Sequence, residues 1–254
     1  MEVQTLKSKF FNDAIVTNKD DRFDVIERFI IVQRWEWEYE EAHQFQKLAH
    51  QYVLEDPSKV IIILCNHPTC FTMGRGLQKK SGKVIENLIE TSFEDRQNFP
   101  YPVYKINRGG GLTYHYPGQL IIYPIFKLGG QNPSLSLLAK NLFTSLIDAS
   151  KEIAGVELYE NSGDLIGLWT KTIMGEKKLA SFGVGIERFI TQHGVAFNLK
   201  HGEVFDYLKS IYPCGINGGV YSHLEELRKE LISLSSFQKS LELKLLNSFS
   251  RRPE

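Results

Sequence analysis

The stretch DLIGLWTKTIMGEKKLASFGVGIERFITQHGVAFNL, residues 164–199, decides the fold. It contains three apolar runs of strand length, at 165–170, 179–186 and 195–199. Turn chemistry separates them, at Met-Gly-Glu 174–176 and at His-Gly 193–194. Connections this short leave no room for a crossover helix, so we predict antiparallel strands that follow one another.

Helices and further strands surround this stretch. We predict helices at 38–56, 133–155, after 222 and through 241–246, and strands at 60–64, 103–107 and 112–128. Pro133 and Gly155 bound the clearest helix, because proline suits the start of a helix and glycine its end. Ser222 and Glu225 have the spacing of a capping box, and Pro117-Gly118 predicts a turn inside the last strand.

The order of these elements indicates one α+β domain. Its strands do not alternate regularly with helices, which favours a central mixed or antiparallel sheet flanked by helices. We expect residues 1–22 to form an N-terminal extension and residues 23–254 to form the catalytic domain. The charged, irregular stretch 78–102 predicts a surface excursion or flap.

Composition excludes several classes of protein. Thirty basic residues balance thirty acidic ones, so no overall field favours nucleic acid. No apolar run approaches the roughly 20 residues of a membrane span, and we find no signal peptide. The three cysteines fit no zinc pattern, so we expect no metal and a reducing, cytoplasmic location.

The sequence RGGGLTYH at 108–115 is the first candidate site. Its glycines permit positive φ and let backbone N–H groups approach a ligand, while Arg108 and His115 add side-chain donors. It is not a phosphate loop, because no Gly-Lys-Ser/Thr follows the glycines. A hairpin turn or a β-bulge is the structural alternative.

Cys214 is the candidate nucleophile. It stands between Pro213 and Gly215, on a tight connection where a thiol can be exposed, although a structural cysteine is the alternative. Cys65 and Cys70 flank an apolar strand, so we expect them to pack in or near the core.

Lys178 is the candidate partner of that thiol. Strand alternation places Lys178, Ala180 and Phe182 on one face. If that face points inward, burial lowers the pKa of the lysine, which can then stabilise a thiolate and relay protons. A solvated hairpin tip is the alternative.

Two histidines precede or follow strands. His193 stands at the predicted turn before an apolar run that ends at Asn198, and it could be a base, an oxyanion donor or a structural residue. His67, in an Asn-His-Pro loop, follows the strand at 60–64. Spacing leaves these roles open.

Taken in order, these motifs resemble those of the lipoyl(octanoyl) transferase family. The family pattern Arg-Gly-Gly-x-x-Thr-Tyr/Phe-His-x-Pro-Gly-Gln corresponds to residues 108–119. The pattern Gly-x-Lys-Lys-hydrophobic-x-Ser/Ala-x-Gly corresponds to residues 175–183. His-Gly-x-Ala-hydrophobic-Asn at 193–198 and Pro-Cys-Gly at 213–215 follow. The resemblance covers about 60–231 and implies a fold like that of biotin and lipoate protein ligases.

The resemblance implies an acyl transfer in two half-reactions without a cofactor or metal. Octanoyl passes from acyl carrier protein to Cys214 as a thioester. It then passes to a lysine amine on lipoyl domains, those of 2-oxoacid dehydrogenase E2 subunits and of the glycine cleavage H protein. Lys178 matches the lysine that assists the cysteine.

The resemblance also assigns the acyl site and its support. The implied substrate-binding residues are Arg108, Gly109, Gly110, Gly111, Leu112, Thr113, Tyr114, His115, Ser181, Phe182, Gly183, Gly194, Val195 and Ala196. The supporting residues are His67, His193 and Asn198. Tyr114, Phe182 and Val195 are the expected walls of the acyl slot.

Three positions depart from the family pattern. Tyr116 replaces a glycine, so that its ring either narrows the acyl slot or points outward; Gly111 replaces a polar residue, and Asn66 replaces a glutamate. These changes bear on chain length and rate more than on reaction type.

Three other functions compete with this one. An ATP-dependent lipoate or biotin protein ligase needs no thiol, a non-catalytic relative only binds lipoyl domains or acyl carrier protein, and a cysteine hydrolase uses Cys214 with His193. Acyl carrier proteins are acidic, so a local basic patch is a candidate docking site. That patch consists of Arg75, Lys79, Lys80 and Lys83.

Overall fold

The computed structural model describes residues 1–12, 20–75, 101–163, 166–203, 205, 218–228 and 230–250. The predicted excursion at 78–102 lies outside these residues except for its last two. So do Cys214, both of its neighbours, Lys79, Lys80 and Lys83.

The described strands form a main sheet of eight and a small sheet of three. The main sheet runs β1 (Arg22–Ile26), β2 (Phe29–Arg34), β3 (Val60–Cys65), β7 (Gln119–Phe126), β11 (Ile190–Asn198), β10 (Gly175–Glu187), β9 (Gly167–Thr172) and β8 (Tyr159–Asn161). The small sheet runs β5 (Val103–Lys105), β4 (Cys70–Met73) and β6 (Leu112–His115). Strands β2 and β3 pair in parallel while the other neighbours in the main sheet are antiparallel, so the predicted mixed α+β sheet is confirmed.

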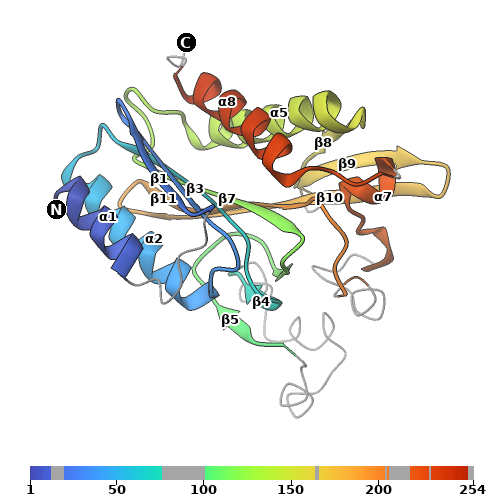
Figure 1. The fold of residues 1–254 in the computed structure, drawn as a ribbon, viewed down its shortest axis with the longest axis horizontal. Helices are drawn as coiled ribbons and strands as arrows, with labels where there is room; N and C mark the ends of the chain where they lie inside the picture. Colours follow the sequence, from blue (N-terminus) through green and yellow to red (C-terminus); the bar gives the residue numbers. More distant parts are fainter. Residues whose placement is uncertain are drawn as a thin grey trace.

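Helices cover both faces of the main sheet (Figure 1). Helices α5 (Leu135–Ala154) and α8 (Leu234–Ser250) lie on one face, and α1 (Val3–Asn12) and α2 (Tyr39–Glu55) lie on the other. The small sheet lies on the α2 side. Short helices η4 (Gly218–Val220) and α7 (Leu224–Arg228) precede α8.

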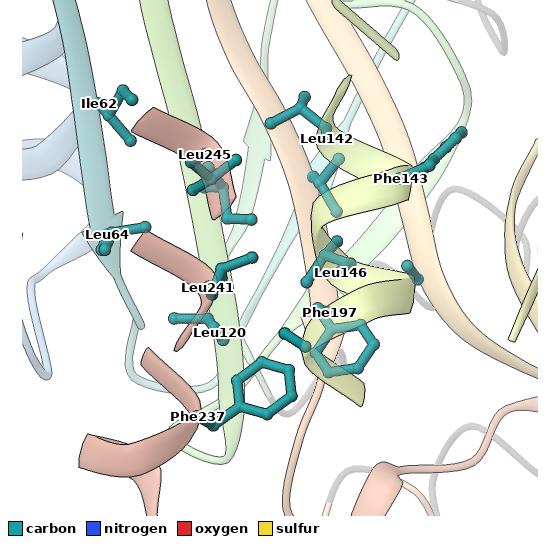
Figure 2. Close-up of a cluster of buried hydrophobic side chains, with 14 of the residues drawn as sticks. Ile62, Leu64, Leu120, Leu142, Phe143, Leu146, Phe197, Phe237, Leu241 and Leu245 are labelled. Carbon is teal, nitrogen blue, oxygen red and sulfur yellow. The ribbon is translucent and has the colours of Figure 1, made fainter. Parts of the chain in front are cut away.

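The core is divided between these two faces. Figure 2 shows the larger cluster, in which Leu142 and Leu146 of α5 and Leu241 and Leu245 of α8 pack on sheet residues such as Leu120. The second cluster lies under α1 and α2 and contains Leu6 and Phe10 of α1. Part of the predicted N-terminal extension therefore packs against the domain.

The clearest predicted helix is confirmed as α5. The hydroxyl of Ser134 accepts a hydrogen bond from the backbone N–H of Leu137 at 3.3 Å and so caps its start. Gly155 ends it in the left-handed region at φ 65°, where glycine has no Cβ penalty.

The antiparallel order of β9, β10 and β11 is confirmed, but one predicted turn is wrong. The chain turns at Arg188 and Phe189, which have φ of 51° and 63° and follow the last pair, Glu187 with Ile190. His193 and Gly194 lie inside β11, where they pair with Val184 and Gly183. Positive φ at both central residues suits a two-residue hairpin, although Arg and Phe are unusual there.

Two local predictions also need correction. The register between β10 and β9 shifts between Lys178 and Ala180, and this irregularity breaks the alternation that placed Lys178 on the face of Ala180 and Phe182. At α7, the ring of His223 accepts from the backbone N–H of Glu226, and Ser222 donates to the Glu226 carboxylate at 2.6 Å. The predicted Ser222–Glu225 capping box does not form this helix start.

Candidate active site

A narrow cleft with a volume of about 20 Å³ lies where the small sheet, the β10–β11 hairpin and the start of α2 meet. Nine residues expected at the site line it, namely Arg108, Thr113, His115, Ser181, Gly183, His193, Gly194, Val195 and Ala196. Five residues that the sequence did not single out complete the lining, namely Tyr39, Thr72, Ile106, Ile121 and Tyr123. The main-chain pairing of β10 with β11 brings most of the first group together.

Arg108 fixes the glycine loop to the small sheet. Its buried guanidinium donates to the carbonyl and the hydroxyl of Thr72, both at 2.9 Å, and to the hydroxyl of Thr113 at 2.8 Å. A further bond runs to the carbonyl of Gly109 at 2.8 Å. These four bonds go to uncharged oxygens.

Glycines let the loop approach β10 and β4. A Cβ on Gly183 would lie 2.9 Å from the carbonyl oxygen of Gly109, and one on Gly74 would lie 2.6 Å from that of Gly110. Within the triplet, only Gly110 has positive φ, at 77°. The close packing therefore depends on Gly183 and Gly74, which face the loop, and Gly109, Gly110, Gly111 and Leu112 do not line the described cleft.

A chain of hydrogen bonds links His115 to Asn198. Nδ1 of His115 lies 2.8 Å from Oε1 of Gln119, whose amide donates to Oδ1 of Asn198 at 3.1 Å. The Asn198 amide donates to the Tyr114 hydroxyl at 2.8 Å and to the Ser222 carbonyl at 3.1 Å. Because the carboxamide of Gln119 donates from nitrogen, its oxygen accepts, and His115 carries its proton on Nδ1.

Three buried histidines beside the cleft are held neutral. Burial lowers the pKa of His67 to about 4. Burial and, second to it, the nearby Arg108 cation lower the pKa of His193 to about 3. The pKa of His115 lies well below its ordinary value for the same reason, with the neighbouring His67 adding to the effect. His67 bonds the Trp37 carbonyl at 2.6 Å and the Tyr123 hydroxyl at 3.0 Å, which is a supporting position outside the cleft lining.

Lys178 is buried next to this cleft. Its exposed fraction is 4%, and Nζ lies 5.5 Å from the ring centre of Trp169 and 6.0 Å from that of Tyr221. Gly167 gives it room, because a Cβ there would lie 3.0 Å from Cε of Lys178. Since Gly167 pairs with Ser181, the lysine stem lies beside the Ser181 end of the cleft.

The remaining expected walls of the acyl slot lie elsewhere. Phe182 packs on Phe143 of α5, on the opposite face of the sheet. Tyr114 and Tyr116 stack on each other in a small cluster with Phe205 and Tyr221. Tyr116 neither narrows the described cleft nor points outward, because it is 1% exposed and its hydroxyl donates to the Lys200 carbonyl at 2.9 Å.

The two described cysteines are poor nucleophiles. Cys65 and Cys70 are buried, as expected, and neither forms a disulfide. Burial raises the pKa of both thiols, that of Cys70 to about 12. Both stay protonated at neutral pH, and a thiol reacts through its thiolate.

Among the described residues, no group of three His, Cys, Asp or Glu side chains could hold a metal ion. A membrane-spanning segment is likewise absent from the part of the chain that the structure describes, since its helices are too short or too polar for one.

Comparison with known proteins identifies relatives over most of the chain. A model of the lipoyl protein ligase A/B catalytic domain matches residues 38–246. The octanoyltransferase of Prochlorococcus marinus is 36% identical over 180 residues, which are 70% of this chain and 68% of that protein. The octanoyltransferase of Syntrophotalea carbinolica is 34% identical over 197 residues, which are 78% and 83% of the two chains.

Solved structures share the fold at low identity. Lipoate-protein ligase A bound with ATP superposes with a TM-score of 0.61 at 11% identity, covering 90% of this chain and 89% of that one. A bi-partite lipoate protein ligase from Thermoplasma acidophilum, studied with its E2 lipoyl domain, gives 0.58 at 12% identity, covering 89% and 84%.

Proposed function

The chain belongs to the lipoyl protein ligase A/B catalytic domain family, and from this premise we propose that Cys214 carries the acyl group as a thioester. The chain is an acyltransferase that transfers octanoyl groups in lipoate biosynthesis. The observation that carries the mechanism is the buried Lys178 beside the Ser181 end of a closed cleft.

The donor in this proposal is octanoyl-acyl carrier protein, and the acceptors are lysines of lipoyl domains in E2 subunits and in the H protein. The reaction takes place in the cytoplasm. Apolar cleft walls such as Ile106, Ile121 and Val195 hold the chain, at about 0.8 kcal/mol for each buried methylene.

In the first half-reaction, the Cys214 thiolate attacks the thioester carbonyl of the donor. The bond from carbonyl carbon to the donor sulfur breaks, and that sulfur leaves and takes up a proton. Lys178 supports this step through its ammonium form, which stabilises the thiolate and supplies the proton.

In the second half-reaction, the acceptor amine attacks the Cys214 thioester. An amide bond forms, the bond to Sγ breaks and the cysteine is restored. Burial disfavours the charged form of a lysine, so Lys178 in its neutral form can take the proton that the amine loses.

Chain connectivity is compatible with this pairing. Lys177 donates to the Gly219 carbonyl at 2.8 Å, and Lys178 pairs with Tyr221 in an isolated parallel bridge. In the sequence, Cys214 precedes Gly218 by four residues.

Mass spectrometry of the intact protein tests the mechanism. Incubation with octanoyl-acyl carrier protein alone should add one octanoyl group, and lipoyl domain should remove it. Cys214→Ser should abolish the thioester adduct, and Lys178→Ala should slow its formation by about 100-fold, the scale of proton-transfer catalysis.

Matched variants serve as controls for that test. Cys70→Ala should keep the adduct because its thiol is protonated, and Lys140→Ala should keep the rate because that lysine is exposed on α5. Continued transfer by Cys214→Ser, or a requirement for ATP with free octanoate, would refute the thioester route.

A further inference from the structure

The cleft has a defined direction, and one end of it lies far from Lys178. Ser181 marks the near end, because it pairs with Gly167, against which the Lys178 side chain packs. Val184 lies three residues after Ser181 on β10 and pairs with His193, at the far end of the cleft. Three residues of strand span about 10 Å, a distance that suits a medium-length acyl chain.

Helix α2 closes the far end. Tyr39, its first residue, lines the cleft and stacks on His115 with ring centres 6.0 Å apart. His43 lies one helical turn later and stacks on His193 at 5.6 Å. Tyr39 is 2% exposed and His193 is 3% exposed, so this end is sealed from solvent.

At this end, two polar atoms of residues that line the cleft are unsatisfied. The Tyr39 hydroxyl and Nε2 of His193 are buried, and neither has a hydrogen-bond partner among the described residues. Nδ1 of His43 and Nε2 of Gln46 also lack a partner there, but these two residues lie outside the cleft lining. Other polar groups of the lining are paired, as the Tyr123 hydroxyl is with His67 and Nε2 of His115 is with Thr72. Buried groups of this kind normally bond a protein atom, a water or a ligand.

We propose that Tyr39 and His193 form a polar end of the cleft that limits the length of the transferred acyl chain. This inference rests on the proposed acyl transfer and adds the residues that set its specificity. A chain that stops short of these two atoms leaves space for water to bond them. A longer chain places methylene groups against them and leaves both without a partner, which disfavours binding.

The substitution Tyr39→Phe removes one of these atoms without breaking a described hydrogen bond. The ratio of kcat/KM for decanoyl over octanoyl thioester should rise about tenfold, the scale of one buried unpaired group. His193→Phe, which keeps a ring to stack on His43, should act in the same direction. Tyr104→Phe is the matched control, because Tyr104 stacks on Tyr39 at 4.7 Å outside the cleft lining, and its ratio should not change.

A pair of ligands of equal length separates hydrogen bonding from simple loss of volume. Decanoate and 9-hydroxynonanoate have the same number of chain atoms, and calorimetry gives their affinities directly. The wild-type protein should favour the hydroxyl-ended acid about tenfold more strongly than Tyr39→Phe does.

The outcomes distinguish this inference from the proposed function. Absence of octanoyl transfer by the wild-type protein would refute the function, while the binding ratios would still decide the inference. Equal ratios in the wild-type protein and Tyr39→Phe, an equal change in Tyr104→Phe, or no binding of either acid would overturn it.

Discussion

At the level of a single residue, Arg108 holds the glycine loop in its shape. Its planar guanidinium reaches Thr72 and Thr113 from one nitrogen and Gly109 from the other. A lysine carries its charge on one nitrogen and has no such fork. The loop therefore depends on the geometry of this side chain as well as on its charge.

We expect Arg108→Lys to lower the free energy of unfolding by about 2–4 kcal/mol, because several buried acceptors lose their donors. Urea denaturation followed by fluorescence measures this change. Lys105→Arg, at an exposed position on β5, should stay within about 0.5 kcal/mol. Similar losses in both variants would show that the fork is not needed.

At the level of elements, the end of β4 packs on the glycine loop through a backbone contact that only glycine permits. The end of β4 approaches the loop at Gly74, whose N–H donates to the Gly111 carbonyl at 2.9 Å. A Cβ on Gly74 would meet the carbonyl oxygens of Gly110 and Gly109 at 2.6 Å and 2.9 Å. The same addition on Gly109 would meet only the Val184 carbonyl oxygen, at 3.6 Å, which is ordinary contact.

Gly74→Ala should therefore cost about 1–3 kcal/mol of stability, because rigid backbone must move apart. Gly109→Ala should cost less than 1 kcal/mol by the same scale. Thermal unfolding of the two variants compares them directly. If the order were reversed, the spacing between β4 and the loop would not be what limits these positions.

The position of an element could be predicted from the sequence where its capping residues and its apolar periodicity agreed. Gly155 and the apolar stripe of α5 identified that helix because capping and periodicity agree there. The turn after β10 was misplaced because His193-Gly194 has turn chemistry, whereas Arg188 and Phe189 adopt positive φ against their own preference. The pairing of β10 with β11 overrides that local signal.

The residues of the candidate site divide in the same way, into those that a motif predicted and those that no local signal marks. Motif order brought Arg108, His115 and Gly194 to one cleft, but Tyr39 and Thr72 come from segments without a motif. No local signal marks the first residue of a helix as a wall of a cleft. Phe182 was placed at the cleft by its motif, yet strand alternation turns it toward α5.

At the level of the whole molecule, three buried, neutral histidines around the cleft make stability depend on pH. His67, His115 and His193 all have lowered pKa values because burial disfavours the imidazolium form. In the unfolded chain each ring titrates near pH 6.5. Below that pH the unfolded state binds more protons than the folded state, so acid favours unfolding.

As far as these rings determine it, the free energy of unfolding has its full value above pH 6.5. It falls as the pH drops from 6.5 toward the pKa of the ring in the folded state, which is about 4 for His67. Each ring contributes on the order of 1 kcal/mol per pH unit to the slope in that window. Urea unfolding at a series of pH values between 5 and 8 measures the slope. His67→Gln should reduce this slope by the contribution of one ring, because the amide of glutamine takes up no proton. An equal slope in the wild-type protein and in His67→Gln would mean that this buried histidine does not govern acid unfolding.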